Sequence, residues 1–234
     1  MITCRAIARL LAYPDKDLQA HMHELKAAIA SEDLVSHRLQ KKLFAFMDGL
    51  ANQDLIDAQE DYIELFDRGR GHSLYLFEHV HGDSRLRGQA MVDLRQQYMD
   101  HGLFPDDKEL PDYLPLFLEY VSILPPLEGQ DSVAEIVHIL AAIGAKLKRK
   151  EGLYALAFEA LTQLSTAKID EDFVNKALRE DEERDDSLEA LDREWADTPA
   201  FDGLGDMADC GGCDQIDLTP PASLEPSTRE GGRA

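Results

Sequence analysis

Apolar residues recur at helical spacing along most of the first 165 positions of the chain. The clearest stripe runs from Val133 to Leu147, where apolar side chains return every three or four residues. It ends in a run of lysine and arginine, which suits a helix C-terminus, and Gly152 follows as a stop signal. Similar spacing predicts further helices over residues 39–50, 53–66, 84–101 and 153–165.

Signals for β-strands are weak by comparison. The best candidate, residues 73–77, is short and isolated, whereas a stable sheet needs several paired strands. No alternating run of β-branched residues is bounded by a hairpin turn. We therefore predict an all-α fold, a single globular bundle of about seven to nine helices.

The composition of the chain changes near residue 170. From Asp170 to Ala234 there are 20 acidic and 6 basic residues, and large apolar residues become rare after Trp195. Such a segment buries too little surface to offset the entropy lost on ordering. We predict an all-helical domain over 1–195, with one or two exposed helices within 171–195, and a flexible acidic tail over 196–234.

The net charge of −22 limits the classes of partner. Nucleic-acid phosphates and anionic lipid head groups repel so acidic a protein, whereas basic or apolar protein surfaces attract it. The sequence has no apolar run long enough to cross a bilayer, and its N-terminus lacks the pattern of a cleaved signal peptide. We expect a cytoplasmic protein that binds no nucleic acid and does not insert stably into membranes.

The stretch richest in reactive side chains is residues 74–88, which join two predicted helices. The candidate ligands of a metal site there are His72, His79, His81 and Asp83. The ligand types suit a metal, although no second cluster completes the site. Alternatively, Glu78 and His79 form an acid–base pair, His79 and Asp83 cap or cross-link helix ends, or the loop binds a peptide.

A second stretch of interest covers residues 109–120. Pro111 suits the first turn of a helix, Asp112 complements the helix dipole, and Leu114 begins an apolar stripe. By spacing alone this is a core helix. Its acid, its tyrosine and its apolar residues would also suit the wall of a groove for an amphipathic peptide.

The three cysteines do not define a scaffold. Cys210 and Cys213 form a C-x-x-C pair in the tail, but redox pairs normally sit on a βαβ unit and zinc would need two further ligands. Cys4 stands alone, so a disulfide framework is not expected. Phosphate loops, dinucleotide fingerprints and nucleophile elbows are also missing from the sequence. Binding is therefore favoured over catalysis.

Three blocks, in matching order and spacing, carry a family resemblance. They are Tyr62–Phe66 (YIELF), Leu76–Gly88 and Glu109–Leu114 (ELPDYL). Over about residues 1–165 the chain resembles the NarJ branch of the TorD-like redox-enzyme chaperones. The stretch from Phe77 to Arg85, followed by Arg87–Met91, is particularly similar to the chaperones of nitrate reductases.

The resemblance implies an all-α, non-enzymatic chaperone that carries no cofactor of its own. Its partner would be the apo catalytic (alpha) subunit of a respiratory nitrate reductase, bound in part through an N-terminal segment similar to a twin-arginine leader. The chaperone would support insertion of the molybdenum cofactor before the enzyme attaches to the membrane. The machinery that delivers this cofactor would be a further partner.

By position, the resemblance also implies a peptide-binding groove. Its residues would be Tyr62, Phe66, Glu78, His79, Asp83, Arg87, Pro111, Asp112 and Tyr113. Acidic side chains in such a groove would attract a basic leader, and its rings would hold the apolar face of the leader. Two alternatives stay open: a leader-binding chaperone for another molybdoenzyme, and a metal-binding helical protein that uses His79, His81 and Asp83.

Overall fold

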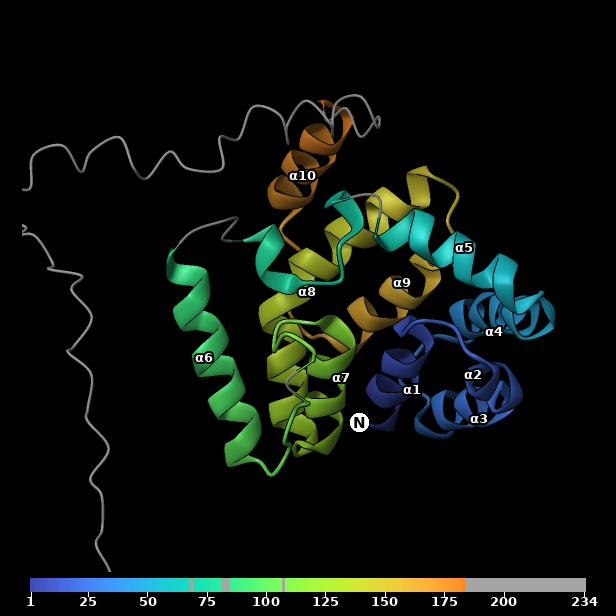
Figure 1. Cartoon of the computed structure of the whole chain (residues 1–234), viewed down its shortest axis with the longest axis horizontal. Helices are drawn as coiled ribbons and strands as arrows, with labels where there is room; N and C mark the ends of the chain where they lie inside the picture. Colours follow the sequence, from blue (N-terminus) through green and yellow to red (C-terminus); the bar gives the residue numbers. More distant parts are fainter. Residues whose placement is uncertain (68–69, 81–84, 107, 184–234) are drawn as a thin grey trace, which may run out of the picture. The chain divides into compact units, whose positions relative to one another are not determined.

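The computed structural model describes residues 1–67, 70–80, 85–106 and 108–183, and the regular secondary structure of these residues is helical (Figure 1). The α-helices are α1 (Ile2–Leu11), α2 (Lys16–Ala20), α3 (Met22–Glu32), α4 (His37–Asn52), α5 (Leu55–Phe66), α6 (Arg85–Asp100), α7 (Leu114–Ile123), α8 (Pro126–Arg149), α9 (Ala155–Leu164) and α10 (Glu171–Glu183). Two short 3₁₀ helices, η1 (Arg70–His72) and η2 (Leu76–His79), lie between α5 and α6.

The all-α prediction is confirmed for the described part of the chain. The described helices number ten rather than seven to nine. Two of them, α2 and α3, follow Asp15 and meet at His21. The candidate strand at 73–77 reduces to an isolated antiparallel bridge between Tyr75 and Tyr113.

The chain divides into two compact units, Met1–Asp186 and Ser187–Ala234, and every described residue belongs to the first. The predicted boundary between residues 195 and 196 lies outside the described residues, as do Cys210 and Cys213. None of the described helices combines the length and the hydropathy that crossing a bilayer requires.

Helix α8 forms the centre of the core (Figure 1). Its apolar stripe is buried: Leu140, Ile143 and Leu147 are inaccessible to solvent, and α7, α9 and α10 pack around the helix. The basic residues at its C-terminal end complement the helix dipole. The helix ends where Gly152 N–H donates to the Leu147 carbonyl at 2.9 Å, as a C-terminal cap does.

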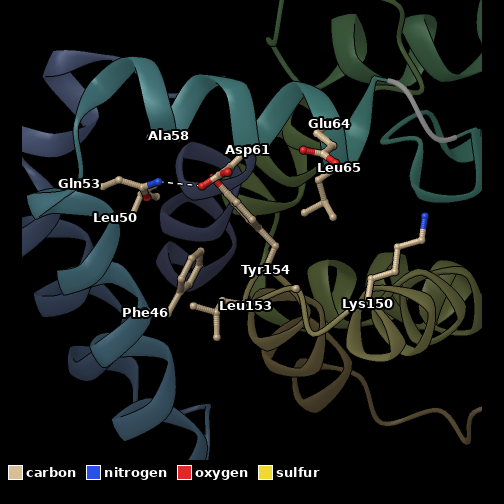
Figure 2. A pocket seen from close by; sticks show the side chains of 11 residues that line it. Phe46, Leu50, Gln53, Ala58, Asp61, Glu64, Leu65, Lys150, Leu153 and Tyr154 are labelled. Atoms are coloured by element: carbon tan, nitrogen blue, oxygen red, sulfur yellow. Dashed lines mark hydrogen bonds between the residues drawn. The ribbon is translucent and has the colours of Figure 1, made fainter.

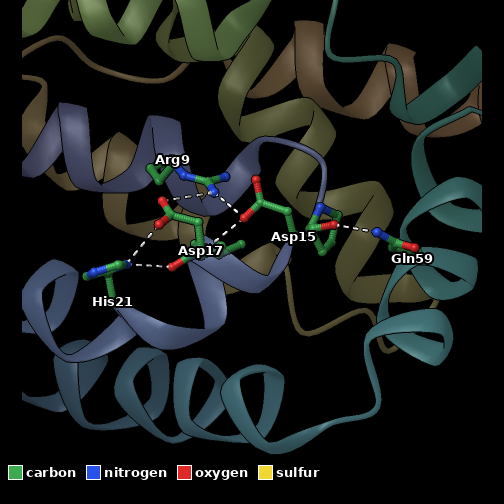
Figure 3. Close-up of polar contacts among 7 residues, drawn as sticks. Arg9, Asp15, Asp17, His21 and Gln59 are labelled. Carbon is green, nitrogen blue, oxygen red and sulfur yellow. Dashed lines mark hydrogen bonds and ion pairs between the residues drawn. The ribbon is translucent and has the colours of Figure 1, made fainter.

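Helix α5 is attached to the rest of the bundle mainly by side chains, because its backbone makes few close contacts with its neighbours. The Tyr62 hydroxyl donates to the Leu11 carbonyl at 2.9 Å. The Gln59 amide, shown in Figure 3, donates to the Pro14 carbonyl at 2.8 Å. In the same turn between α1 and α2, the Arg9 guanidinium pairs with the Asp15 carboxylate. Side chains of α5 therefore attach this helix to the end of α1 and to the turn that follows it.

We expect Leu140→Ala to lower the free energy of unfolding by about 3 kcal/mol, because the truncation leaves a cavity in a fully packed core. Leu127→Ala, in the same helix but at a side chain that is 76% exposed, should change it by less than about 0.5 kcal/mol. Urea unfolding measures both values. Equal effects of the two substitutions would show that α8 is not buried as described.

Candidate functional site

The two stretches that the sequence singles out lie side by side in the structure. Leu76 N–H donates to the Asp112 carbonyl at 2.9 Å, and Leu114 N–H donates to the Leu74 carbonyl at 2.8 Å. These two bonds frame the bridge between Tyr75 and Tyr113, whose rings lie 5.5 Å apart. The loop after α5 is thereby fixed to the N-terminus of α7.

Asp112 is the polar centre of this junction. Its side chain is completely buried, and its Oδ2 atom accepts a hydrogen bond from Phe77 N–H at 3.1 Å. The Arg87 guanidinium lies 3.8 Å from Oδ2 and 3.4 Å from the Glu78 carboxylate. Burial raises the pKa of Asp112, and the Phe77 N–H and the Arg87 charge only partly oppose that rise. In this conformation Asp112 holds the loop rather than facing solvent.

The neighbouring predicted residues also have specific partners. The Pro111 carbonyl accepts a hydrogen bond from the buried Tyr98 hydroxyl of α6 at 2.7 Å. The Nε2 atom of His79 lies 2.9 Å from the Ser73 carbonyl oxygen. Thus Glu78, with its partner Arg87, is the more exposed part of the cluster, whereas Pro111 and Asp112 form its interior.

Tyr62 and Phe66 belong to an aromatic cluster between α5, α4 and α9. The ring of Phe66 lies 4.8 Å from that of Tyr62 and 5.2 Å from that of Tyr154, and Phe46 approaches Tyr154 at 4.9 Å. The pKa of Tyr62 is raised by burial and further by the charge and hydrogen bond of Tyr113. Tyr113 therefore links the aromatic cluster to the Asp112 junction.

The metal-site alternative receives no support from the described residues. Among them, no three histidine, cysteine or acidic side chains are placed to hold a metal ion. His81 and Asp83 lie outside the described part, so Asp83 has no observed place in the groove either. Glu78 and His79 face different partners, Arg87 and Ser73, which disfavours an acid–base pair. Cys4 is completely buried in the core, and this burial raises the pKa of its thiol to about 12.

An open cleft of about 540 Å³ lies beside the aromatic cluster (Figure 2). One wall is α5, the second is the C-terminal half of α4, and the third is the turn between α8 and α9. Its apolar lining consists of Phe46, Leu50, Ala58, Leu65, Leu153 and Tyr154. Asp61 and Glu64 stand on the α5 side, and Lys150 stands across from Glu64.

Sequence reasoning missed most of this cleft. Leu153 reads as part of the apolar stripe of the following helix, yet it lies in the turn before α9 and is 60% exposed. One signal was present: Asp61 and Glu64 are three residues apart on a helix, so they share a face with each other and adjoin Leu65. Glu64 and Leu65 belong to the YIELF block that carries the family resemblance, and Asp61 directly precedes this block.

These features define a helical protein with an open cleft that has an apolar floor and acidic residues along one wall. The chain belongs to the nitrate reductase delta subunit family, whose sequence profile matches residues 13–160.

Individual relatives agree with this assignment. The chain is 45% identical over 212 residues to the nitrate reductase molybdenum cofactor assembly chaperone NarJ of Escherichia coli K12, covering 89% of each protein. It is 43% identical over 191 residues to the probable chaperone NarW of the same strain, covering 82% of this chain and 79% of NarW. The probable NarJ of Bacillus subtilis 168 is 31% identical over 155 residues, 66% of this chain and 83% of that protein.

The comparisons confirm the predicted resemblance to NarJ-type chaperones. The names of these relatives describe assembly factors rather than catalysts, which agrees with the prediction of a non-enzymatic protein.

Asp112→Asn tests whether the Asp112 carboxyl is buried in the folded chain. Because burial raises its pKa above the ordinary 3.8, the folded chain takes up a proton more readily than the unfolded chain. As pH falls through the raised pKa, the native protein should therefore gain stability relative to the Asn variant. Urea unfolding between neutral pH and about pH 4 measures the difference.

The matched control is Asp106→Asn, which changes an exposed carboxylate. The change in the stability difference between neutral and acid pH should be larger for Asp112→Asn than for this control. If the unfolding free energy of the native protein minus that of Asp112→Asn stays constant or falls as the pH is lowered, the burial of this carboxyl is contradicted.

Proposed function

We propose that the chain is a cytoplasmic chaperone for the catalytic subunit of a respiratory nitrate reductase. It binds the apo subunit, including its N-terminal leader-like segment, and keeps the subunit competent for insertion of the molybdenum cofactor before membrane attachment. The observation that carries this proposal is the open cleft between α4, α5 and the α8–α9 turn, in a chain of the NarJ family.

The apolar floor of the cleft suits one face of an amphipathic helix. Its volume of about 540 Å³ falls within the range of sites that hold small ligands or a few side chains. Helix-in-groove recognition uses apolar anchors spaced three or four residues apart. The exposed Leu153 and the half-buried Leu65 offer contacts for such anchors on opposite sides of the cleft.

The acidic wall suits basic residues that flank those anchors. Asp61 and Glu64 lie on α5, and the chain as a whole carries a net charge of −22. Charge complementarity of this kind speeds encounter and selects the partner more than it adds affinity. A leader that carries arginine or lysine beside an apolar face would satisfy both parts of the cleft.

The predicted groove residues then take different parts in binding. We assign Tyr62 and Phe66 an indirect part. Their rings pack against Tyr154, which lines the cleft. The junction formed by Glu78, His79, Arg87, Pro111, Asp112 and Tyr113 fixes the adjoining loop. Of this group, Glu78 is exposed, and we assign it the direct contact with a basic client.

Two further parts of the proposal concern partners. The machinery that delivers the molybdenum cofactor would meet the chaperone–client complex, while the chaperone itself holds no cofactor. A different molybdoenzyme as the client is the alternative, and the names of the relatives favour nitrate reductase.

Calorimetry with a synthetic peptide of the client N-terminus tests the apolar part of the cleft. Leu153→Ser removes an exposed apolar contact, so we expect about a tenfold weaker affinity, in line with the loss of part of a leucine's burial energy. The control is Leu127→Ser, at an exposed leucine that does not line the cleft, and it should bind as the native chain does. Equal affinity of the native chain and Leu153→Ser would reject the cleft as the peptide site.

The acidic wall has its own test. The double substitution Asp61→Asn with Glu64→Gln should slow association of the peptide at low salt by about threefold or more and flatten its dependence on salt. Asp57→Asn with Glu60→Gln removes the same charge from exposed positions of α5 outside the cleft and serves as the control. Stopped-flow binding measures both rates; identical salt dependence in the two double variants would contradict charge recognition at this wall.

A further inference from the structure

Helix α10 packs on the C-terminal half of α8 through both apolar and ionic contacts. The ring of Phe173 lies 5.7 Å from that of His138, and Phe173 packs against the hydrophobic core. Near the other end, the Arg149 guanidinium donates to the Leu178 carbonyl at 3.3 Å and to the Glu182 carboxylate at 2.5 Å. An acidic amphipathic helix thus covers the basic end of α8.

The most unusual contact at this interface involves Lys146, whose side chain is buried. Lysine is rarely buried unless its charge is compensated. Here the ammonium group donates to the Gly71 carbonyl of η1 at 3.2 Å and lies 4.0 Å from the Asp181 carboxylate of α10. One side chain of α8 therefore connects α10 to the loop that follows α5.

Gly71 and Asp181 approach each other closely. A methyl group added at Gly71 would lie 2.2 Å from the Asp181 Oδ1 atom, far inside contact distance. The Asp181 carboxylate therefore occupies the space that a side chain at position 71 would fill, and a larger residue there would displace it. The loop and the helix are thus in direct contact as well as being joined through Lys146.

The same contacts reach two walls of the cleft. The η1 loop continues from the C-terminal end of α5, which supplies Glu64 and Leu65 to the cleft. Lys150, which also lines the cleft, follows Lys146 by one helical turn at the end of α8. The contact between Lys146 and the η1 loop therefore joins the two elements that carry these walls, α8 and the segment after α5.

We propose that α10 is a regulatory strap: by docking on Lys146 and Arg149 it clamps the η1 loop and holds the cleft walls at the spacing that binds the client segment. This inference rests on the proposed function of the cleft and adds a control element to it. The strap lies beyond residue 160, where the match to the family profile ends. Its release loosens the α5 wall and weakens binding, because a preorganised cleft loses less entropy when it is filled.

Two substitutions loosen the strap from opposite sides in the full-length chain. Asp181→Asn weakens the charge contact with Lys146 from the α10 side. Gly71→Ala keeps every charge but displaces the Asp181 carboxylate from the loop side, and a rotation of the aspartate relieves the clash. The control is Glu180→Gln, on the same helix, whose carboxylate pairs only with the exposed Lys176 among the described residues.

Hydrogen exchange of the free protein tests the coupling without any client. In both loosened variants, we expect amide exchange to accelerate about fivefold or more in α10, in residues 70–76 and in the last turn of α5, while Glu180→Gln behaves as the native chain. Faster exchange confined to α10, or no change anywhere, would overturn the strap.

Titration with the N-terminal client peptide tests the consequence for binding. The two loosened variants should bind about threefold or more weakly, and Glu180→Gln should bind as the native chain does. If the variants with faster exchange in the loop bound the peptide as tightly as the native chain does, the proposal that α10 controls the cleft would be overturned. If the native chain itself failed to bind the peptide, the proposed function would fail, and the exchange result would still decide whether α10 clamps the loop.

Discussion

The aromatic cluster of Phe46, Tyr62, Phe66 and Tyr154 is the contact on which the candidate site depends. It joins α5 to α4 and α9 through edge-to-face and tilted ring pairs, each worth about 0.5–1.5 kcal/mol beyond the burial of its area. Large rings also keep the helix backbones apart, so α5 is held firmly without closing onto its neighbours. The cleft is the space that this arrangement leaves open (Figure 2).

A second constraint is the polar junction around Asp112, which fixes the loop between α5 and α6. Burying a charged carboxylate costs free energy, and the pKa of Asp112 is raised because burial disfavours its charged form. The Phe77 N–H and the Arg87 guanidinium offset part of it and, in doing so, join η2 and α6 to the residue that precedes Tyr113 and α7. Tyr113 adds to the raised pKa of Tyr62, so the junction and the aromatic cluster adjoin each other.

Local spacing predicted the helices well because a buried stripe repeats every 3.6 residues wherever a helix packs. The buried stripe of α8 is an example. The helix predicted at 84–101 is observed as Arg85–Asp100. Spacing could not distinguish Leu140, which is buried, from Leu153, which lines the cleft, because burial depends on which distant element arrives at each position. For the same reason Asp112 resembled a surface acid: its partner Phe77 lies 35 residues earlier in the chain.

The central claim, that the cleft receives the N-terminal segment of the immature catalytic subunit, is tested most directly by site-specific photo-crosslinking. A photoreactive amino acid at position 153, in full-length chaperone produced together with the apo subunit, reports what touches the cleft; position 127 is the control, because Leu127 is exposed outside the cleft. We expect position 153 to crosslink to the N-terminal segment, and position 127 to give no such product. Crosslinks from position 153 to other parts of the subunit alone, or equal capture of the N-terminal segment from both positions, would contradict the claim.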